Sequence, residues 1–394
     1  MSELNTENYS TLHNTTQGYG RTGLRLKPFI LPLIQDAKAA RILDHGCGKG
    51  ALGNHLREEG HDIILFDPYV EAYKNRPDGH FDIVLSTDVL EHISLDELSS
   101  VLEDIKSFSD KAVFVISLTF ADQILQDGKN AHCTIQSKEW WAKKLSEVFP
   151  KVYEASTRQE TACCFVTWDV SKETSRLLER RRRIRRRKER LLRKVLSPIK
   201  LIGDRLKRWV TMDEALSILE GKSVAIIGNS TRLTDAENGH DIDEHDIVIR
   251  LNRAPIMSKQ SHGTKTDWIA TSTPISSGLV DGRKVSLSLW MTAKCSRIPV
   301  WMFGSKRKVF RFPKSAYRRL KHDLSSRPSS GFMVIDLVRK SKAKSISIYG
   351  FDGFVSGSLS SAQTKESAPH NFDHEYSVLQ KIAANDPRFR IVLL

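Results

Sequence analysis

Short apolar runs recur along the chain, and stretches with helical periodicity separate most of them. In the first part of the sequence these runs are Arg41–Asp44, Ile63–Phe66, Phe81–Leu85, Ala112–Ile116 and Cys164–Trp168. Runs of this length predict buried strands, and their alternation with helices predicts βαβ units around a sheet. The pattern therefore indicates an α/β domain, which we place at residues 1–172.

The same alternation starts again at residue 213. The runs of this second part are Ser223–Ile227, Ile247–Leu251, Asp267–Ala270, Val300–Phe303, Ile346–Tyr349 and Ile391–Leu394. The two parts share no evident repeat. The 394-residue chain is therefore predicted to hold two unlike α/β domains, the second at residues 213–394.

A basic segment, residues 173–212, separates the two predicted domains. Residues 173–210 contain 16 Lys and Arg and four Asp and Glu, so they carry 12 of the 14 excess positive charges of the chain. The charge is local, and it predicts an anionic partner for this segment rather than a nucleic-acid-binding protein as a whole. The apolar residues of the segment keep a helical spacing, with a break expected near Pro198.

Three interpretations of this amphipathic helix are open. The first is a solvated connecting helix, with a short coiled coil through Leu177, Ile184 and Leu191. The second, which we favour, is a helix on an anionic membrane surface. The residues in the lipid would then be Leu192, Leu196, Leu206 and Trp209. The third is an RNA-binding arm, which the lack of interleaved aromatic residues disfavours.

The sequence also bears on the compartment. It has no run of about 18 apolar residues, and its first residues are polar, so we expect neither a membrane-spanning helix nor a signal peptide. Its five cysteines are too scattered for a disulfide framework or a zinc site. We expect a cytoplasmic protein, peripheral on the inner face of the cytoplasmic membrane.

A glycine-rich turn follows the first predicted strand. It contains Asp44, Gly46, Gly48 and Gly50, and Asp67 ends the next strand. Glycines let a ligand approach the backbone and a helix N-terminus. A carboxylate 19 residues after Gly48 can accept hydrogen bonds from both ribose hydroxyls of an adenosine-containing cofactor. The same glycine spacing also fits a dinucleotide site.

The segment Phe81–His92 resembles the fourth-strand motif of class I S-adenosylmethionine-dependent methyltransferases. The resemblance covers about residues 10–170 and implies a Rossmann-like fold with S-adenosylmethionine as cofactor. It implies that the glycine turn lies beside the methionine portion, that Asp67 holds the ribose, and that residues after the strand, such as Asp88, border the methyl-transfer site. Only twelve residues separate Pro68 from Phe81, so we expect the third strand of the family to be shortened or missing.

Methyl transfer to a hydroxyl needs an aligned acceptor and a base whose pKa lies near neutrality. His92 and His132 are the candidates. His132 lies in a polar loop shortly before Trp140 and Trp141, and this loop would suit a sugar acceptor. The structural alternatives are that His92 caps the strand turn and that the two tryptophans belong to the core.

Two predicted strand ends of the second domain present amide side chains. Gly228, Asn229 and Ser230 follow one strand, and Asn252 follows the next. The amides can donate to a phosphate or recognise a pyrimidine, and Gly228 permits close approach. We do not interpret the pattern Asp241–Asp243 as a metal site, because a lone D-x-D in a polar loop is common.

This stretch, continuing into Gly263–Thr266, closely resembles the large sialyl motif of family 29 glycosyltransferases, the sialyltransferases. Pro328–Gly331 through Ile348–Phe351 resembles the small motif, and His370–Glu375 fits the very small motif. Three motifs in family order imply a variant of the GT-A-like α/β fold and a CMP-linked acidic sugar as donor. They also imply inversion at the anomeric carbon without a metal ion.

The resemblance also implies roles for single residues. Asn229 and Asn252 would hold CMP. Ser329, Ser330 and Gly331 are assigned to substrate binding, the last two near the cytidine or the donor carboxylate. The two residues assigned to catalysis are His370, which would take the proton of the acceptor hydroxyl, and Glu375, which would support that histidine or its helix.

The sequence departs from the family in two respects. The cysteine pair that usually bridges the large and small motifs is absent, since Val224 and the region of Ala343 occupy those places; this fits a reduced cytosol. Residues 352–369 contain no histidine, so the histidine-containing third motif is missing and His374 or a lysine is left to face the leaving phosphate. CMP-sialic acid and CMP-Kdo both fit as donors.

The sequence thus predicts a bifunctional glycan-modifying enzyme, an O-methyltransferase fused to a CMP-sugar glycosyltransferase. Its acceptor would be a glycan, such as a lipid-linked polysaccharide. The alternatives are an RNA methyltransferase with a basic RNA-binding arm, and a membrane-surface scaffold with one degenerate enzyme domain.

Overall fold

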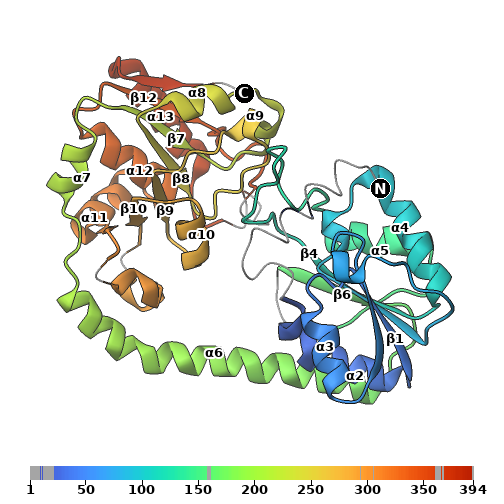
Figure 1. Ribbon diagram of the computed structural model, residues 1–394. Helices are drawn as coiled ribbons and strands as arrows, with labels where there is room; N and C mark the ends of the chain where they lie inside the picture. The colour runs from blue at the N-terminus through green and yellow to red at the C-terminus, as the bar shows by residue number, and fades with distance from the viewer. Residues whose placement is uncertain are drawn as a thin grey trace. The chain divides into compact units, whose positions relative to one another are not determined.

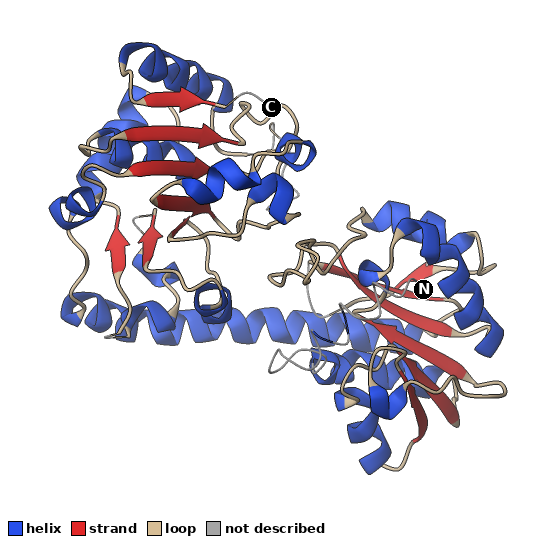
Figure 2. Cartoon of the chain, turned by 45° about the horizontal axis from the view of Figure 1, so that its top comes forward, coloured by secondary structure: helices blue, strands red, loops and turns tan. Residues whose placement is uncertain are grey.

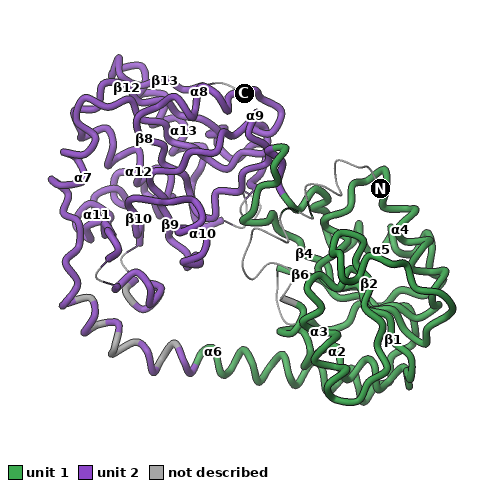
Figure 3. Tube along the Cα trace, in the orientation of Figure 1, with its two compact units in different colours: residues 1–127, 131–190 green, residues 128–130, 191–394 purple. Residues whose placement is uncertain are grey.

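The computed structural model describes residues 9, 11, 22–157, 161–292, 294–304, 306–359, 365 and 368–392 (Figure 1). The chain forms two units (Figure 3): residues 1–127 and 131–190 make the first, and residues 128–130 and 191–394 make the second. The boundary at residue 190 lies inside α6 (Lys172–Leu206). Each unit has its own sheet and its own core.

The sheet of the first unit has six strands in the order β2-β1-β3-β4-β6-β5. The strands of the sheets are drawn in red in Figure 2. The strands are β1 (Arg41–His45), β2 (Asp62–Phe66), β3 (Ile83–Thr87), β4 (Ala112–Ser117), β5 (Tyr153–Glu154) and β6 (Ala162–Val166). β2, β1, β3 and β4 are parallel, and β6 runs antiparallel to both β4 and β5. The α/β prediction is confirmed, although β5 was not predicted.

Helices cover both faces of this sheet. They are α2 (Lys27–Asp36), α3 (Ala51–Glu58), α4 (Leu95–Phe108) and α5 (Lys138–Ser146), with 3₁₀ helices at Thr22–Leu26, Glu71–Tyr73 and Leu90–His92. Consecutive strand residues point to opposite faces, so Ile42 joins the apolar cluster with α2 and α3, while Leu43 joins the one with α4 and α5. Trp141 is fully buried in the second cluster and therefore belongs to the core rather than to an acceptor loop.

The segment after β2 is short, as predicted. Residues 69–80 contain one 3₁₀ helix, Glu71–Tyr73, and among the described residues no strand lies beyond β2 in the sheet. The expected loss of the family's third strand is confirmed.

The sheet of the second unit has seven parallel strands in the order β11-β10-β9-β8-β7-β12-β13. They are β7 (Ser223–Ile227), β8 (Ile247–Leu251), β9 (Trp268–Thr271), β10 (Leu287–Trp290), β11 (Val309–Arg311), β12 (Ser345–Tyr349) and β13 (Phe389–Ile391). The last strand begins earlier than predicted, and residues 393–394 of that prediction lie outside the described residues.

One strand prediction in this unit is wrong. Val300–Phe303 forms a 3₁₀ helix, which begins directly after Pro299 and ends at Gly304. Val300 is 60% exposed while Met302 is buried, so the apolar run does not mark a buried strand. The strands that follow β9 are instead β10 and β11, which were not predicted.

Helices of the second unit cover both faces of its sheet. They are α7 (Met212–Ile218), α8 (Gly239–Glu244), α9 (Lys259–His262), α10 (Ser277–Gly282), α11 (Lys314–Asp323), α12 (Ser330–Arg339) and α13 (Phe372–Asn385). α7, α11, α12 and α13 contribute to the largest apolar cluster, which contains Ile226, Trp268 and Val334. α8 and α10 pack against strand residues that point away from those of this cluster.

The basic segment is helical, as predicted, but the expected break near Pro198 is absent. α6 continues through Pro198 to Leu206, because a proline removes a single backbone donor and the neighbouring hydrogen bonds can continue the helix. Leu178 is buried in the first unit, and Lys200 donates to the carbonyl of Ser296 in the second. None of the described helices has both the length and the apolar character needed to span a membrane.

Candidate active sites

Each sheet has a point where the strand order reverses. In the first unit the chain runs from β1 to β2 on one side and then to β3 on the other. In the second unit β7 is followed by β8 on one side, and β12 lies on its other side. Ligands of open α/β sheets bind beyond the carboxyl ends of the strands at this point, and the predicted site residues of both units lie there.

The glycine turn after β1 requires its glycines. Gly46, Gly48 and Gly50 have φ values of 75°, 56° and 70°, which side chains rarely adopt. A Cβ atom on Gly46 would lie 2.4 Å from Cγ2 of Val89. The turn leads into α3, whose first residue is Ala51.

Two carboxylates lie beside this turn. Asp67 accepts hydrogen bonds from the backbone N–H of Gly48 (2.7 Å) and of Tyr69 (3.0 Å). Asp44 is buried, and burial together with the negative charge of Asp67 raises its pKa to about 7. Asp67 thus fixes the turn through one oxygen, and each of its oxygens has a second lone pair for a ligand.

The loop after β3 carries further polar residues. Asp88 follows the strand with a φ of 57°, and its N–H donates to the carbonyl of Val115 (2.8 Å). Glu91 is fully buried, and its Oε1 accepts a hydrogen bond from the backbone N–H of Ser117 (2.9 Å). Burial and the charge of Asp88 raise the pKa of Glu91 well above its ordinary value.

The structure brings His92 and His132 together. Their rings lie edge to face with centroids 4.6 Å apart. Nδ1 of His92 lies 2.7 Å from the carbonyl oxygen of Ala131, and Nδ1 of His132 lies 2.6 Å from that of Thr119. Carbonyl oxygens only accept, so each Nδ1 carries the hydrogen and the lone pair of each neutral ring is on Nε2.

The second unit contains a cavity of about 440 Å³ at the switch point of its sheet. The nine residues of this unit that were assigned to catalysis or substrate binding all line it: Gly228, Asn229, Ser230, Asn252, Ser329, Ser330, Gly331, His370 and Glu375. Residues of all three predicted motifs therefore share one cavity. His374, the candidate to face the leaving phosphate, is exposed and is not among the lining residues.

The strand ends shape the floor of this cavity. A Cβ atom on Gly228 would lie 2.1 Å from the carbonyl oxygen of Gly350, so only glycine fits between β7 and β12. Nδ2 of Asn229 lies 3.4 Å from the carbonyl oxygen of Leu251. Asn252 has a φ of 57°, a conformation that asparagine tolerates better than most residues.

The N-terminus of α12 forms another wall. Ser329 caps this helix, its hydroxyl accepting from the N–H of Phe332 (3.1 Å). The carboxylate of Glu375, on α13, accepts from the N–H and the hydroxyl of Ser329. Burial raises the pKa of Glu375 to about 7. His370 instead donates through Nδ1 to the carbonyl of Arg327 (2.8 Å), so Glu375 is joined to the helix N-terminus rather than to His370.

Other residues of the cavity were not predicted. Ser272 follows β9, and its hydroxyl lies 2.7 Å from that of Ser330. Asp352 follows β12 and accepts from the hydroxyl of Ser230 (3.0 Å). The rings of Phe354 and Phe372 stack with centroids 4.5 Å apart, and Tyr376 lines the cavity near them. Ser272 and Asp352 follow strands, and this position could have indicated them as site residues.

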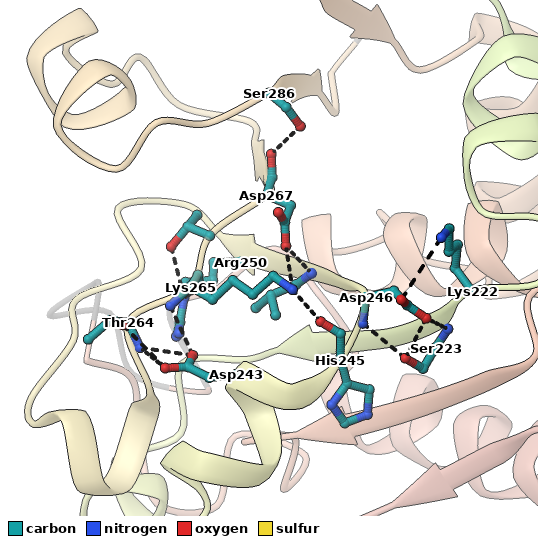
Figure 4. A network of polar contacts seen from close by, with 12 residues as sticks. Lys222, Ser223, Asp243, His245, Asp246, Arg250, Thr264, Lys265, Asp267 and Ser286 are labelled. Atoms are coloured by element: carbon teal, nitrogen blue, oxygen red, sulfur yellow. Dashed lines mark hydrogen bonds and ion pairs between the residues drawn. The ribbon is translucent and has the colours of Figure 1, made fainter.

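The D-x-D pattern has a structural role at Asp243. Its carboxylate accepts from the backbone N–H groups of Thr264 and Lys265, at 2.8 to 2.9 Å (Figure 4). Next to it the buried Arg250 donates to the carbonyls of His262 (2.7 Å) and Lys265 (2.9 Å). Burial lowers the pKa of Arg250 to about 9. This network holds the turn after α9.

Comparison with known families identifies both units. A family model described as a methyltransferase domain matches residues 19–160, and one described as glycosyltransferase family 29 (sialyltransferase) matches residues 172–298. The chain joins a methyltransferase domain to a family 29 glycosyltransferase domain. The fusion predicted from the sequence motifs is confirmed.

A curated relative matches a short part of the chain. Over 43 residues the chain is 49% identical to CMP-N-acetylneuraminate-beta-galactosamide-alpha-2,3-sialyltransferase 1 of Gallus gallus. The match covers 11% of this chain and 13% of that protein, so the chain spans about an eighth of the length of this relative.

Solved structures resemble each unit at low identity. A mammalian sialyltransferase crystallised with Gal-beta-1-3GalNAc-ortho-nitrophenol is 18% identical with a TM-score of 0.33, and the match covers 49% of this chain and 83% of that one. The sialyltransferase CstII from Campylobacter jejuni is 12% identical with a TM-score of 0.32, and the match covers 43% of this chain and 81% of that one. A Burkholderia thailandensis 1,6-didemethyltoxoflavin-N1-methyltransferase is 17% identical with a TM-score of 0.32, and the match covers 42% of this chain and 88% of that one.

Proposed function

We propose that the chain is a bifunctional glycan-modifying enzyme. Its second unit transfers an acidic sugar, sialic acid or Kdo, from the CMP donor to a glycan hydroxyl with inversion. Its first unit methylates a hydroxyl, on the same or a neighbouring sugar, with S-adenosylmethionine. The observation that supports the transferase best is the single cavity lined by the nine residues that were assigned from three motifs. The family 29 match favours this function over the RNA methyltransferase.

The residues of the cavity suit the chemistry of a CMP donor. CMP leaves with one phosphate, so amide, hydroxyl and backbone donors can meet the developing charge. Asn229 and Asn252 would hold CMP. Ser330 and Gly331, at the N-terminus of α12, would lie near the cytidine or the donor carboxylate, where the helix dipole favours an anion.

His370 would be the general base. Its Nδ1–H is held by the carbonyl of Arg327, so Nε2 carries the lone pair that accepts the proton of the acceptor hydroxyl. The acceptor oxygen then forms a bond to the anomeric carbon while the bond to the CMP oxygen breaks, and CMP leaves with the electron pair. Glu375 would act as a positioning residue by holding Ser329.

In the first unit the glycine turn and Asp67 would hold S-adenosylmethionine, with Asp44 and Asp88 beside it. Its sulfonium methyl group supplies the reactive carbon. His92 and His132, whose rings are in contact, are the groups placed to activate an acceptor hydroxyl. The acceptor oxygen would displace the thioether in one step, so the main task of the unit is alignment.

The second half of α6 supports a membrane-associated location. Five apolar side chains there are more than half exposed: Leu191, Leu192, Val195, Ile202 and Leu206. They lie among basic residues, a combination that favours an anionic lipid surface. Trp209 was expected in the lipid, but it packs against Phe303 (ring centroids 5.9 Å apart). We infer a cytoplasmic enzyme that meets its lipid-linked acceptor at the membrane.

CMP release by the purified full chain tests the transferase. CMP-sialic acid and CMP-Kdo are offered separately with a panel of bacterial glycans. We expect acceptor-dependent release from one donor and its loss in His370→Ala. His322→Ala, which alters an exposed histidine of α11, should leave the rate unchanged. Failure of the cavity to bind CMP in calorimetry would contradict the proposal and favour a scaffold.

A further inference from the structure

Glu91, to which the proposed reaction gives no role, lies close to His92 and His132 in the first unit. Glu91, His92 and His132 each offer one ligand atom, and these atoms all lie within 4.8 Å of one another. Two imidazoles and a carboxylate are ligands that divalent transition metals prefer, at distances of about 2.0–2.2 Å from the ion.

A second observation at the same place points to a cation. Glu91 is fully buried, and its Oε2 has no hydrogen-bond partner among the described residues, whereas Oε1 is held by the N–H of Ser117. A buried carboxylate oxygen without a donor is costly. A positive ion beside Oε2 would remove this cost.

The two histidines are held as metal-bound histidines usually are. Ligating imidazoles commonly donate their second ring N–H to a carbonyl or carboxylate, which fixes the tautomer and the ring orientation. Here Nδ1 of His92 donates to the carbonyl of Ala131, and Nδ1 of His132 donates to that of Thr119. Both rings therefore carry the ligating lone pair on Nε2.

We propose that Glu91, His92 and His132 form a binding site for one divalent transition-metal ion. No metal was expected from the sequence, in which 39 residues separate the two histidines. The site lies beyond the carboxyl end of β3, next to Asp88, which is where the methyl acceptor is proposed to bind. His92 and His132 then act as ligands rather than as general bases.

The role of the ion rests on the proposed methyltransferase function, but ion binding does not. A bound cation lowers the pKa of a coordinated hydroxyl. The acceptor oxygen then forms a bond to the methyl carbon of S-adenosylmethionine as the S–CH₃ bond breaks. The electron pair of that bond stays on sulfur, and the hydroxyl proton passes to solvent.

The test measures metal binding directly. Full-length protein without a histidine tag is stripped with EDTA and titrated with Mn²⁺, followed by electron paramagnetic resonance, and with Zn²⁺, followed by calorimetry. We expect one equivalent of either ion and at least tenfold weaker binding of Mg²⁺, because imidazole ligands select transition metals.

Variants of single residues test which side chains bind the ion. In His132→Asn the amide can still donate to Thr119 while the ligating nitrogen is lost, and we expect at least a tenfold loss of Mn²⁺ affinity. The matched control is His240→Ala, which alters the exposed group His240, Asp241 and Glu244 and should bind as the wild type does. A thermal melt without metal shows whether His132→Asn is folded; if it is not, His92→Asn takes its place.

Two results would overturn the proposal. One is the absence of saturable uptake of either transition-metal ion by folded protein, and the other is equal affinity in wild type and His132→Asn. Titration with S-adenosylhomocysteine separates this outcome from a failure of the methyltransferase function. Protein that binds S-adenosylhomocysteine but no metal refutes the metal site alone, while the reverse refutes the function alone.

Discussion

The carboxylate of Glu375 accepts hydrogen bonds from the backbone N–H of Ser329 at 2.7 Å and from its hydroxyl at 2.5 Å. The two residues lie 46 positions apart, at the N-terminal ends of α12 and α13. This pair joins two sequence motifs in one cavity wall. It also places a titratable carboxyl group in the interior of the second unit.

The first prediction concerns the effect of pH on stability. Burial raises the pKa of Glu375 to about 7 from an ordinary value of 4.5, so the folded unit holds this proton more tightly than the unfolded chain does. The stabilisation that the folded unit gains from the protonated Glu375 is complete below pH 4.5 and is lost as pH rises through 7. Urea unfolding measures the free energy of unfolding at pH 5 and at pH 8. From pH 5 to pH 8 this free energy should fall by about 1–3 kcal/mol more in the wild type than in Glu375→Gln.

The control for this measurement is Glu244→Gln, since Glu244 is exposed. It should follow the wild type at both pH values. An unchanged pH dependence in Glu375→Gln would show that the carboxyl group is not titrating in this range.

The second prediction concerns the junction of β7 and β12. In Gly228→Ala the added methyl group would lie 2.1 Å from the carbonyl oxygen of Gly350, which is backbone and cannot rotate away. We expect a loss of at least about 2 kcal/mol in the free energy of unfolding and weaker CMP binding. Gly278→Ala, in α10 with open space around the site, should be neutral or slightly stabilising. Equal stabilities would contradict the close approach.

Sequence patterns predicted those parts of the fold that local spacing determines. The runs at β1, β2, β7, β8 and β12 are buried strands, because a buried parallel strand needs a continuous apolar stretch. Val300–Phe303 has the same composition, yet Pro299 before it and an exposed Val300 place it in a 3₁₀ helix. Composition alone does not distinguish these cases.

In the candidate sites, too, local sequence patterns predicted some features and missed others. Asn229 and Asn252 could be named because they follow predicted strands, whose parallel ends meet at one edge of the sheet. Ser329–Gly331, His370 and Glu375 were named only because their stretches resemble the motifs of a known family.

The contact between His92 and His132, and the oxygen of Glu91 that has no partner among the described residues, depend on how the loop after β4 folds back. No local pattern encodes that return, so the three side chains were not recognised as one group.

The third prediction concerns nucleotide binding. Asn229 is proposed to donate to the phosphate of CMP, and Asn229→Asp would place a carboxylate in that position. Repulsion between the two anions should weaken CMP binding at least tenfold in calorimetry. Asn238→Asp, at the N-cap of α8 and outside the cavity lining, serves as the matched control. Wild-type affinity in Asn229→Asp would remove Asn229 from the phosphate site.

The fourth prediction concerns α6. Leu191, Leu192 and Val195 are each more than half exposed, and their replacement by serine should reduce sedimentation with phosphatidylserine vesicles at least fivefold. Binding to vesicles of phosphatidylcholine alone should be weak, and salt should weaken binding to the anionic ones. Val355→Ser, which alters an exposed apolar residue outside α6 (66% exposed), is the control. Equal sedimentation of the triple variant would show that the exposed row does not enter lipid.

The fifth prediction concerns the cofactor site of the first unit. Asp67 holds the glycine turn through the N–H of Gly48 and is proposed to bind the ribose. In Asp67→Asn an NH₂ group replaces one acceptor oxygen, so it would face either the N–H of Gly48 or that of Tyr69, and neither can accept. Affinity for S-adenosylhomocysteine, measured by calorimetry, should fall at least tenfold.

Asp78→Asn is the matched control for this variant, because Asp78 is exposed in the segment after β2. A loss of affinity in Asp67→Asn has two sources, a distorted turn and a missing ribose contact. Comparing S-adenosylhomocysteine with its 2′-deoxy analogue separates them. If Asp67 binds the ribose, the wild type should prefer the parent compound and Asp67→Asn should not, whereas a purely structural role would leave that preference intact.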